Sequence, residues 1–221
     1  MKNEVRMRNY NKRSEKEYNW FRTVFTNFVC RYIYGLYYKI WYRMEVQGLE
    51  NVDKNSSLVI AANHLCSIDP FLIAGALKRP VAFMAKEQLF EKPLSRLFMN
   101  LFGAFAVNRD KLEVSTIKTA LSIKKTKWDL GLFPQGTREI SGTITRIQKG
   151  FAALAKTMKS NILPVAVINT DKKSLFPFRE KIIIKIGKEI PYCDDIDYMV
   201  EQWKDTILQM TGFEYKPQED R

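Results

Sequence analysis

The residues with the clearest chemical potential are His64 and Asp69. His64 is the single histidine of the chain, and Asp69 follows five positions later, directly before Pro70. Imidazole is neutral near pH 7 and can accept a proton from a hydroxyl group, while a carboxylate beside it holds the tautomer and stabilises the imidazolium that forms. The spacing predicts a turn that folds Asp69 back onto His64, so that the pair can activate a hydroxyl group on a substrate.

Each of these residues also has an ordinary structural explanation. A histidine near a strand end is commonly a structural residue, and an aspartate before a proline commonly caps a helix. The pair therefore needs support from other parts of the chain.

Residues 133–138, with the sequence Phe-Pro-Gln-Gly-Thr-Arg, follow a predicted strand and suit a phosphate. The backbone N–H groups of this turn, the Thr137 hydroxyl and the Arg138 guanidinium are all donors that phosphate oxygens accept. The alternative is an ordinary turn from a strand into a loop.

Two more cations end predicted strands. Lys86 follows one apolar run, and Arg109 follows another at residues 103–107. Because α/β folds place ligands at the carboxyl ends of strands, these cations and His64 are predicted to meet at one edge of a sheet. Alternatively, each cation is a solvated charge on the rim of the domain.

From residue 49 onward, short apolar runs alternate with helical periodicity, which predicts an α/β fold with a mixed central sheet flanked by helices. The predicted strands are residues 58–62, 81–85, 103–107, 130–133, 162–168 and 182–186. The predicted helices are residues 70–77, 93–102, 112–127 and 150–158, followed by a closing amphipathic helix over residues 196–210. We assign residues 44–221 to this domain.

Residues 1–43 differ in character and are predicted to be an amphipathic, helical membrane-surface segment. Residues 1–17 are rich in Lys, Arg and Asn and are expected to be too hydrophilic to pack. Residues 18–42 hold eleven aromatic side chains in 25 positions. On a helix, one side would carry Phe21, Val24, Phe25, Phe28, Val29 and Tyr32, and the other Arg22, Thr23, Thr26, Asn27 and Arg31.

Charged residues decide how this segment would meet a membrane. Arg22, Arg31, Lys39 and Arg43 interrupt every window of about 20 residues that could span a bilayer. The segment is therefore predicted to lie in the interface, with Trp and Tyr at headgroup depth and the cations toward anionic lipid. Gly35 could break the helix. The alternative is that the aromatic side chains cap the core of the domain.

The composition is that of a folded, basic protein. The net charge is +12, and residues 1–43 contain ten Lys and Arg against three Glu, which favours a nucleic acid, an anionic membrane or an acidic protein or substrate as partner. Cys30, Cys66 and Cys193 are far apart, with no CxxC pair and no signal peptide, so we expect reduced thiols on the cytoplasmic side. A chain with one histidine and no ligand cluster gives no reason to predict a metal site.

Taken in order, the motifs resemble those of the glycerolipid acyltransferase family, and within it the 1-acylglycerol-3-phosphate acyltransferases. Four blocks match, and Lys86 and Lys149-Gly150 extend the likeness over roughly residues 45 to 190. The blocks are Asn63-His64 through Asp69, residues 103–109, residues 133–138 and Leu163-Pro164-Val165.

The resemblance implies transfer of a fatty acyl group from acyl-CoA or acyl carrier protein to the sn-2 hydroxyl of lysophosphatidic acid, giving phosphatidic acid. His64 would be the base and Asp69 would orient it. Acceptor binding would fall to Lys86, Arg109, Gln135, Gly136, Thr137 and Arg138, with the three cations holding the phosphate. No cofactor and no covalent acyl-enzyme is implied. The implied setting is the cell membrane, where the protein would be peripheral or monotopic on the cytoplasmic face and would contact an anionic surface.

One position departs from the family. Where the family usually has glutamate, this chain has Gln135, which can form hydrogen bonds but can neither carry charge nor act as a base. The histidine chemistry is unaffected, but the departure leaves open a different lyso-lipid acceptor, including one without a terminal phosphate.

The charge alone also allows a non-catalytic module that binds nucleic acid or membranes. Such a module predicts basic residues interleaved with stacking aromatic side chains along a groove. Here the aromatic residues instead share a helical apolar face, and the strand-end motifs would have no explanation. We therefore expect no nucleic-acid partner.

Overall fold

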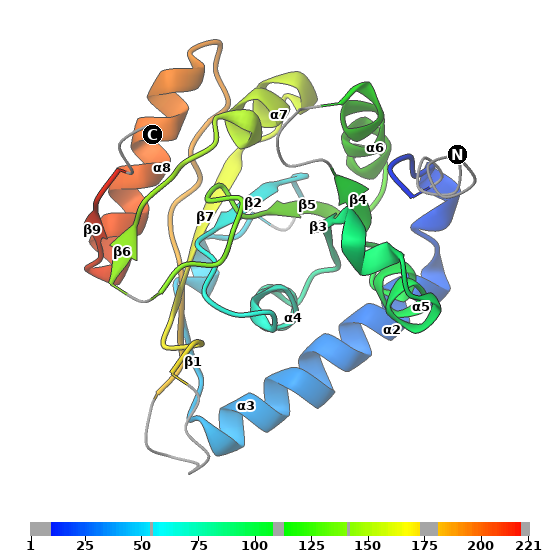
Figure 1. Cartoon of the computed structure of the whole chain (residues 1–221), viewed down its shortest axis with the longest axis horizontal. Helices are drawn as coiled ribbons and strands as arrows, with labels where there is room; N and C mark the ends of the chain where they lie inside the picture. Colours follow the sequence, from blue (N-terminus) through cyan, green and yellow to red (C-terminus); the bar gives the residue numbers. More distant parts are fainter. Residues whose placement is uncertain (1–9, 54, 108–112, 141, 173–180, 218–221) are drawn as a thin grey trace.

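The computed structural model describes residues 10–53, 55–107, 113–140, 142–172 and 181–217 (Figure 1). Over these residues the chain forms a seven-stranded sheet in the order β1-β8-β7-β2-β5-β3-β4. Its strands are β1 (Glu45–Gln47), β2 (Val59–Ala62), β3 (Val81–Lys86), β4 (Phe105–Val107), β5 (Asp129–Leu132), β7 (Ile162–Ile168) and β8 (Ile183–Ile186). A separate small sheet pairs β6 (Thr143–Ile144) with β9 (Glu214–Tyr215).

Neighbouring strands β7, β2, β5, β3 and β4 all run in one direction. β8 is antiparallel to β7, and β1 is parallel to β8, so the sheet is mixed, as predicted. Because the carboxyl ends of parallel strands share one edge, the segments that follow β2, β5 and β3 lie side by side.

The helices close to the sheet lie where the periodicity predicts them. They are α4 (Asp69–Leu77), α5 (Pro93–Leu101), α6 (Val114–Lys124), α7 (Gly150–Met158) and α8 (Ile196–Thr211). The predicted strands are confirmed as well, each shifted by at most a short stretch at its ends. β1, β6 and β9 were not predicted, because each has only two or three residues and, unlike β4, lacks an apolar run.

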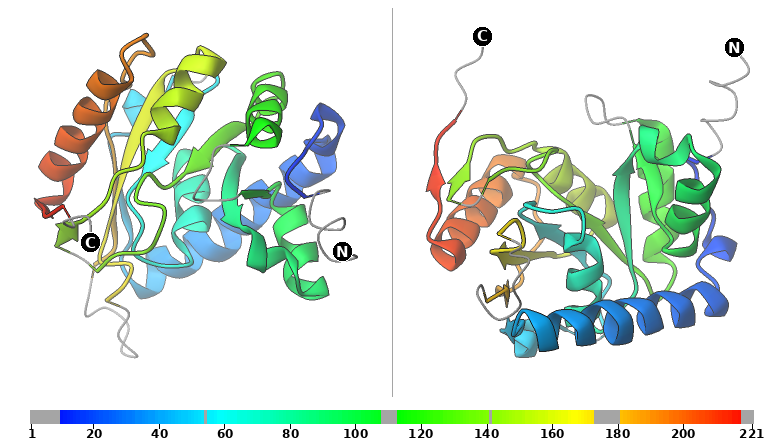
Figure 2. Two further views of the ribbon diagram at one scale, coloured as in Figure 1. Left: turned by 45° about the horizontal axis from the view of Figure 1, so that its top comes forward. Right: turned by 60° about the horizontal axis from the view of Figure 1, so that its bottom comes forward.

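Alternation along β2 builds the two faces of the core. Val59 and Ala61 point into a cluster shared with α6, α7 and α8, whereas Ile60 and Ala62 point into a cluster shared with α4 and the amino-terminal helix. Side chains on successive strand residues face opposite sides of a sheet, so a strand buried on both sides must be apolar throughout. The result is a sheet between two helical layers (Figure 2).

A buried ion pair lies at the amino end of β2, the end away from His64. Arg79 Nε lies 2.7 Å from Asp129 Oδ2, and Asp129 Oδ1 accepts the Leu58 N–H at 2.9 Å. Burial raises the pKa of the Asp129 carboxyl to about 6, against the lowering effect of Arg79. These contacts connect the amino ends of β2 and β5, the two strands whose other ends carry the conspicuous motifs.

The amino-terminal helix is one continuous rod. It consists of α2 (Trp20–Phe28), a π-helical stretch (Val29–Gly35) and α3 (Leu36–Trp41), and it runs along one side of the molecule (Figures 1 and 2). Gly35 does not break it, because its backbone is helical at φ −58° and ψ −46°. Among the described residues, none of the helices combines the length and the apolar character needed to cross a bilayer.

The side of the rod that faces the domain carries both polar and apolar side chains. Thr26 is 1% exposed and donates to the carbonyl oxygen of Leu101 on α5 at 3.3 Å, and Thr23 Oγ1 accepts the indole N–H of Trp128 at 2.9 Å. Cys30 is buried in the cluster beneath. The outward side is apolar and exposed at Trp20, Phe21, Val24, Phe28, Tyr32, Ile33, Leu36, Tyr37, Ile40 and Trp41. Phe25, Val29 and Tyr34 pack on the same cluster as Cys30, and Tyr38 is buried in it. The aromatic side chains of the rod therefore both cap the core of the domain and form an exposed apolar surface.

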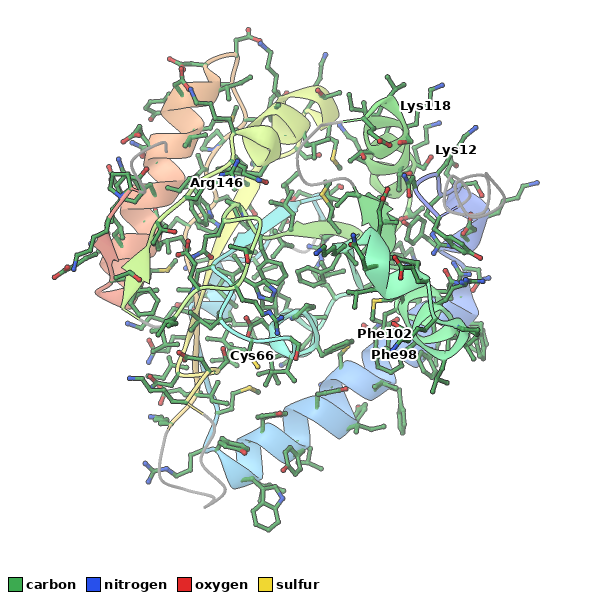
Figure 3. All side chains as sticks on the ribbon, in the orientation of Figure 1. Lys12, Cys66, Phe98, Phe102, Lys118 and Arg146 are labelled. Atoms are coloured by element: carbon green, nitrogen blue, oxygen red, sulfur yellow. The ribbon has the colours of Figure 1, made fainter. Side chains whose placement is uncertain are left out.

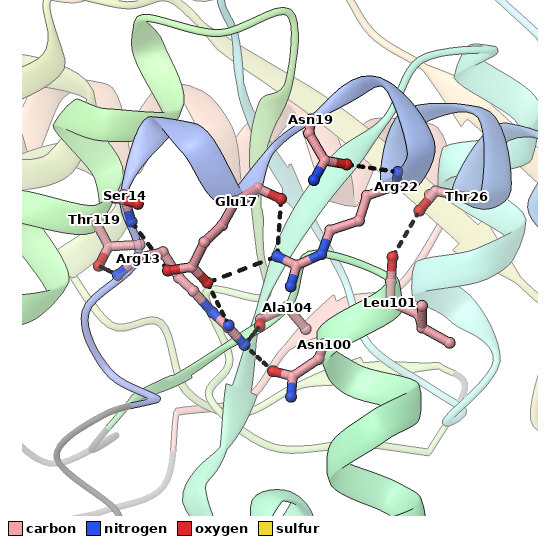
Figure 4. Close-up of polar contacts among 10 residues, drawn as sticks. All are labelled: Arg13, Ser14, Glu17, Asn19, Arg22, Thr26, Asn100, Leu101, Ala104 and Thr119. Carbon is pink, nitrogen blue, oxygen red and sulfur yellow. Dashed lines mark hydrogen bonds and ion pairs between the residues drawn. The ribbon is translucent and has the colours of Figure 1, made fainter.

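The segment before the rod also packs against the domain, so the expectation that it is too hydrophilic to pack is wrong for residues 10–17. The first nine residues lie outside the described part of the chain. Arg13 is 6% exposed, and its guanidinium donates to Asn100 Oδ1 and, at 3.0 Å, to the carbonyl oxygen of Ala104 (Figure 4). Glu17 completes the cluster with an ion pair to Arg13 at 2.6 Å. Polar residues can be buried here because they find hydrogen-bond partners on α5 and in the turn that precedes β4.

The crossing of the rod and α4 yields a prediction. A Cβ atom at Gly75 would lie 2.4 Å from the carbonyl oxygen of Cys30. We expect Gly75→Ala to lower the free energy of unfolding by about 1–3 kcal/mol, because the two helix backbones would have to move apart. Urea unfolding of the variant measures this. Gly150→Ala is the control, since a Cβ there meets no atom within 4 Å. Equal stability of wild type and Gly75→Ala would contradict the close crossing.

Candidate active site

Asn63 fixes the point at which β2 ends and His64 begins. Its side chain is buried and forms two hydrogen bonds with one residue of β7. Asn63 Nδ2 donates to the Val167 carbonyl oxygen at 2.9 Å, and Asn63 Oδ1 accepts the Val167 N–H at 2.7 Å. The amide thus replaces a backbone pair of the β2–β7 ladder, which holds the chain in place as it leaves the sheet.

The turn after His64 brings Asp69 back to the imidazole, as the spacing predicts. His64 Nδ1 lies 2.9 Å from Asp69 Oδ2, and the same oxygen accepts the backbone N–H groups of Leu65 and Cys66 at 2.8 and 2.7 Å. Asp69 is fully buried at the start of α4. The two backbone N–H groups that converge on one oxygen favour an anionic carboxylate. Cys66, labelled in Figure 3, marks this loop beside α4.

This geometry sets the tautomer of the imidazole. An ionised carboxylate only accepts hydrogen bonds, so Nδ1 carries the proton and Nε2 keeps its lone pair. In the described part of the chain, no hydrogen bond is made to Nε2. A histidine held in this way can take a proton from a hydroxyl group, and the carboxylate behind it can stabilise the imidazolium.

Aromatic stacking fixes the plane of the ring. The Phe133 ring lies 3.9 Å from the His64 ring between centroids, with 14° between their planes, and Phe83 stacks on Phe133 at 5.4 Å. Phe133 follows β5 and Phe83 belongs to β3, the next strand in the sheet. The imidazole therefore packs on aromatic side chains supplied by neighbouring strands.

Both backbone groups of His64 are held by the loop that follows β5. The His64 N–H donates to Gln135 Oε1 at 2.6 Å, and the His64 carbonyl oxygen accepts the Glu139 N–H at 2.9 Å. The other end of the Gln135 amide donates to Glu139 Oε2 at 2.6 Å. Gln135 is 1% exposed, and both ends of its amide are used within the protein.

Gly136 is required by the shape of the same loop. Its φ of +71° lies in the left-handed region, and a Cβ there would come within 2.7 Å of the Gln148 side chain. Its N–H donates to the Phe133 carbonyl oxygen at 2.9 Å, closing the turn.

The cations stand at the same edge of the sheet as His64. Lys86 is exposed at the carboxyl end of β3, and Thr137 and Arg138 are exposed on the loop after β5. β5 lies between β2 and β3, so these segments follow on one side of the end of β2 that carries His64. Arg109 lies outside the described residues. Within the described part of the chain, no group of three or more His, Cys, Asp or Glu is placed to hold a metal ion.

Two contributors to the site were not predicted from the sequence. Glu139 lies just beyond the motif that ends at Arg138. Its partners are Gln135 and Thr145, four and six residues away, and His64, which only the fold brings close. Phe133 lies within the motif, but its place against His64 depends on β2 and β5 being neighbours. A Glu near a Gln in a strand-end loop was the available signal for the first.

Comparison with known proteins gives a consistent picture. A family model described as Acyltransferase matches residues 43–168. A 1-acyl-sn-glycerol-3-phosphate acyltransferase of Borreliella burgdorferi is 30% identical over 128 residues, which are 57% of this chain and 51% of that protein. A Saccharomyces cerevisiae protein of the same name is 33% identical over 132 residues, 58% of this chain and 43% of that protein. The match thus spans about half the length of these relatives.

The fold is also similar to that of a solved structure. The crystal structure of the 1-acyl-sn-glycerophosphate acyltransferase from Thermotoga maritima superimposes with a TM-score of 0.62 at 20% identity, covering 76% of this chain and 71% of that one. At this identity the likeness establishes the fold alone.

The tautomer of His64 can be tested directly, because the chain contains a single histidine. In protein labelled with ¹⁵N-histidine, we expect the ring nitrogen signals of a neutral imidazole protonated at Nδ1. Asp69→Asn should weaken the preference for the Nδ1-protonated form, because the amide oxygen that replaces Oδ2 and accepts the Leu65 and Cys66 N–H groups is a weaker acceptor for Nδ1–H than a carboxylate.

Cys66→Ser is the control for this experiment, since it keeps the backbone N–H that donates to Asp69. It should leave the ring signals unchanged. A wild-type imidazole protonated at Nε2 would contradict the assigned role of Asp69.

Proposed function

Because this chain belongs to the acyltransferase family through residues 43–168, we propose that it acylates lysophosphatidic acid. The donor would be acyl-CoA or acyl carrier protein, the acceptor the sn-2 hydroxyl of 1-acylglycerol-3-phosphate, and the product phosphatidic acid. One observation carries the proposal: His64 is held by the buried Asp69 with its Nε2 unpaired in the described structure, at the sheet edge that also bears Lys86 and Arg138.

The reaction follows from the state of the imidazole. His64 Nε2 accepts the proton of the acceptor hydroxyl as the hydroxyl oxygen attacks the thioester carbonyl carbon. The new C–O bond forms, the C–S bond breaks as the tetrahedral intermediate collapses, and the imidazolium returns its proton to the leaving thiolate. Asp69 stabilises the imidazolium between these two steps. The substrate hydroxyl is the nucleophile, so no acyl-enzyme forms.

The acceptor's phosphate would be held by the exposed donors at the same edge. The side chains involved are exposed: Lys86, Thr137 and Arg138. They supply an ammonium, a hydroxyl and a guanidinium group, all of which donate hydrogen bonds to phosphate oxygens. Arg109 is included on the sequence pattern alone. The relatives named as 1-acyl-sn-glycerol-3-phosphate acyltransferases support this choice of acceptor.

The departure at Gln135 does not favour a different acceptor. Its side chain is buried, and its amide is occupied by the His64 N–H and the Glu139 carboxylate. A direct contact between Gln135 and the substrate stays a prediction. The alternative acceptor without a terminal phosphate was suggested only by Gln135, and a buried amide with both ends bonded does not support it.

We also propose that the apolar side of the α2–α3 rod lies in the interface of a lipid bilayer. Exposed apolar patches of this extent are uncommon on monomeric proteins and mark binding to proteins or membranes. Trp20 is 77% exposed. Two cations on the rod, Arg31 and Lys39, are exposed as well, which suits anionic headgroups. The charge excess of residues 1–43 supports the same anionic surface.

α5 extends this apolar surface onto the catalytic domain. Leu94 is 79% exposed, and Leu97 and Phe98 are exposed on the same helix. Phe98 contacts Phe102 (Figure 3). Phe102 in turn contacts Phe25 of the rod, with 5.5 Å between the ring centroids. A membrane that receives the rod would therefore also meet α5.

An assay of the purified protein tests the enzymatic proposal. Lysophosphatidic acid and other lyso-lipids should be crossed with acyl-CoA and acyl carrier protein donors. We expect phosphatidic acid to form, and His64→Ala to lower kcat by about a factor of 10³ or more while the protein stays folded and vesicle binding remains that of wild type. A His64→Ala variant with wild-type turnover would eliminate the proposed base.

Vesicle cosedimentation tests the membrane surface. Trp20→Ser and Phe28→Ser should each weaken binding to vesicles of phosphatidylglycerol and phosphatidylcholine, by roughly 10-fold or more, because an apolar side chain of this size contributes about 1.5–3 kcal/mol when buried. Arg31→Gln should weaken binding to these vesicles but not to neutral ones.

Tyr198→Ser is the matched control for this experiment. Tyr198 is 54% exposed on α8, a helix that packs on the other face of the sheet. Equal losses for Tyr198→Ser and Trp20→Ser would argue against a specific membrane surface on the rod.

A further inference from the structure

Gln135 lies between two groups of opposite hydrogen-bonding character. On one side is the His64 N–H, which can only donate; on the other is the Glu139 carboxylate, which accepts. A glutamine amide has an acceptor at one end and a donor at the other, so it satisfies both neighbours in one orientation. The carboxylate at Glu139 selects that orientation, because the reversed amide would set oxygen against oxygen and N–H against N–H.

Glu139 is itself firmly held. Thr145 Oγ1 donates to Glu139 Oε1 at 2.6 Å, and the Thr145 N–H lies 3.1 Å from both carboxylate oxygens. Thr145 directly follows β6, which pairs with β9. Both oxygens of Glu139 therefore have hydrogen-bond partners within the protein, as expected of a structural carboxylate and not of one that binds substrate.

A second contact joins Glu139 to the same residue of the dyad. Its backbone N–H donates to the His64 carbonyl oxygen at 2.9 Å. Glu139 thus holds the backbone N–H of His64 through Gln135 and holds the His64 carbonyl oxygen directly. These two backbone groups fix the position of the Cα atom that carries the imidazole.

We infer that Glu139 is a positioning residue for His64, acting through the amide of Gln135. This inference rests on the proposed function for its effect on turnover. It also explains the glutamine where the resembling family usually has glutamate: a carboxylate at position 135 would face Glu139 at hydrogen-bond distance and repel it. The residues at 135 and 139 form a coupled pair in which one carboxylate and one amide are required.

Exchange of the two side chains tests the pair. The variants are Q135E, E139Q and the exchanged double variant Q135E/E139Q, with the same assay applied to each. Q135E should lower kcat by about 10-fold or more with little change in KM, because two facing carboxylates displace the His64 loop. The double variant restores one carboxylate and one amide, and its kcat should return to within about 3-fold of wild type.

A measurement without substrate separates this inference from the proposed function. Protein labelled with ¹⁵N-histidine has one histidine backbone amide signal, that of His64, whose N–H donates to Gln135. Q135E should move this signal, and the exchanged variant should bring it back toward the wild-type position. If wild type acylates no lyso-lipid but the signal behaves in this way, the proposed function fails and the positioning role stands.

Two outcomes would overturn the inference. One is a double variant whose kcat equals the product of the two single effects, which would show that positions 135 and 139 act independently. The other is a loss confined to KM, with the His64 amide signal unmoved in Q135E, which would make the pair part of substrate binding. E139Q keeps the test decisive if Q135E does not fold, since an unmoved His64 signal and unchanged kcat in E139Q would also overturn it.

Discussion

The contact between His64 Nδ1 and Asp69 Oδ2 is the constraint that the surrounding structure serves. It requires the chain to leave β2 at a fixed point, turn within four residues and enter α4 with a buried carboxylate. Asn63 fixes the exit from the sheet, and the N–H groups of the turn bind the carboxylate. Stacking on Phe133 fixes the plane of the His64 ring, and the loop after β5 fixes the position of its backbone. Both contacts come from the strand next to β2 and not from the turn itself.

α4 connects this dyad to the apolar rod. It begins at Asp69, and six residues later Gly75 lies against the backbone of Cys30 in the π-helical part of the rod. The outward side of the rod is apolar, and Gly75 of α4 has no side chain, which lets the two helices approach closely at Cys30. A nine-residue helix therefore spans the distance between the proposed membrane surface and the proposed base. Such a short, buried element leaves little freedom for one to move relative to the other.

The neighbourhood of Gln135 illustrates how a departure from a family pattern is accommodated. The amide meets a donor on one side and a carboxylate on the other, so the charge lost at 135 is present at 139. The buried position of the pair makes complete hydrogen bonding the governing requirement, because an unpartnered polar group there would be costly. Substrate recognition is left to exposed groups at the rim, of which Lys86 and Arg138 are the described cations.

The sequence by itself determined the longer elements of the domain, the dyad of His64 and Asp69, and the strand-end loops, because these depend on local periodicity and on residues a few positions apart. It also indicated that residues 18–42 form an amphipathic helix. Only the tertiary structure decided which side of that helix faces outward, since periodicity shows that an apolar stripe exists and not which surroundings it meets. The same holds for Arg13, Gln135 and Glu139. Arg13 is buried because Asn100 and Ala104 receive it, and Gln135 holds His64 across 71 positions of sequence. Hydrogen-bond partners so distant along the chain are chosen by the folded arrangement of strands and leave no local pattern.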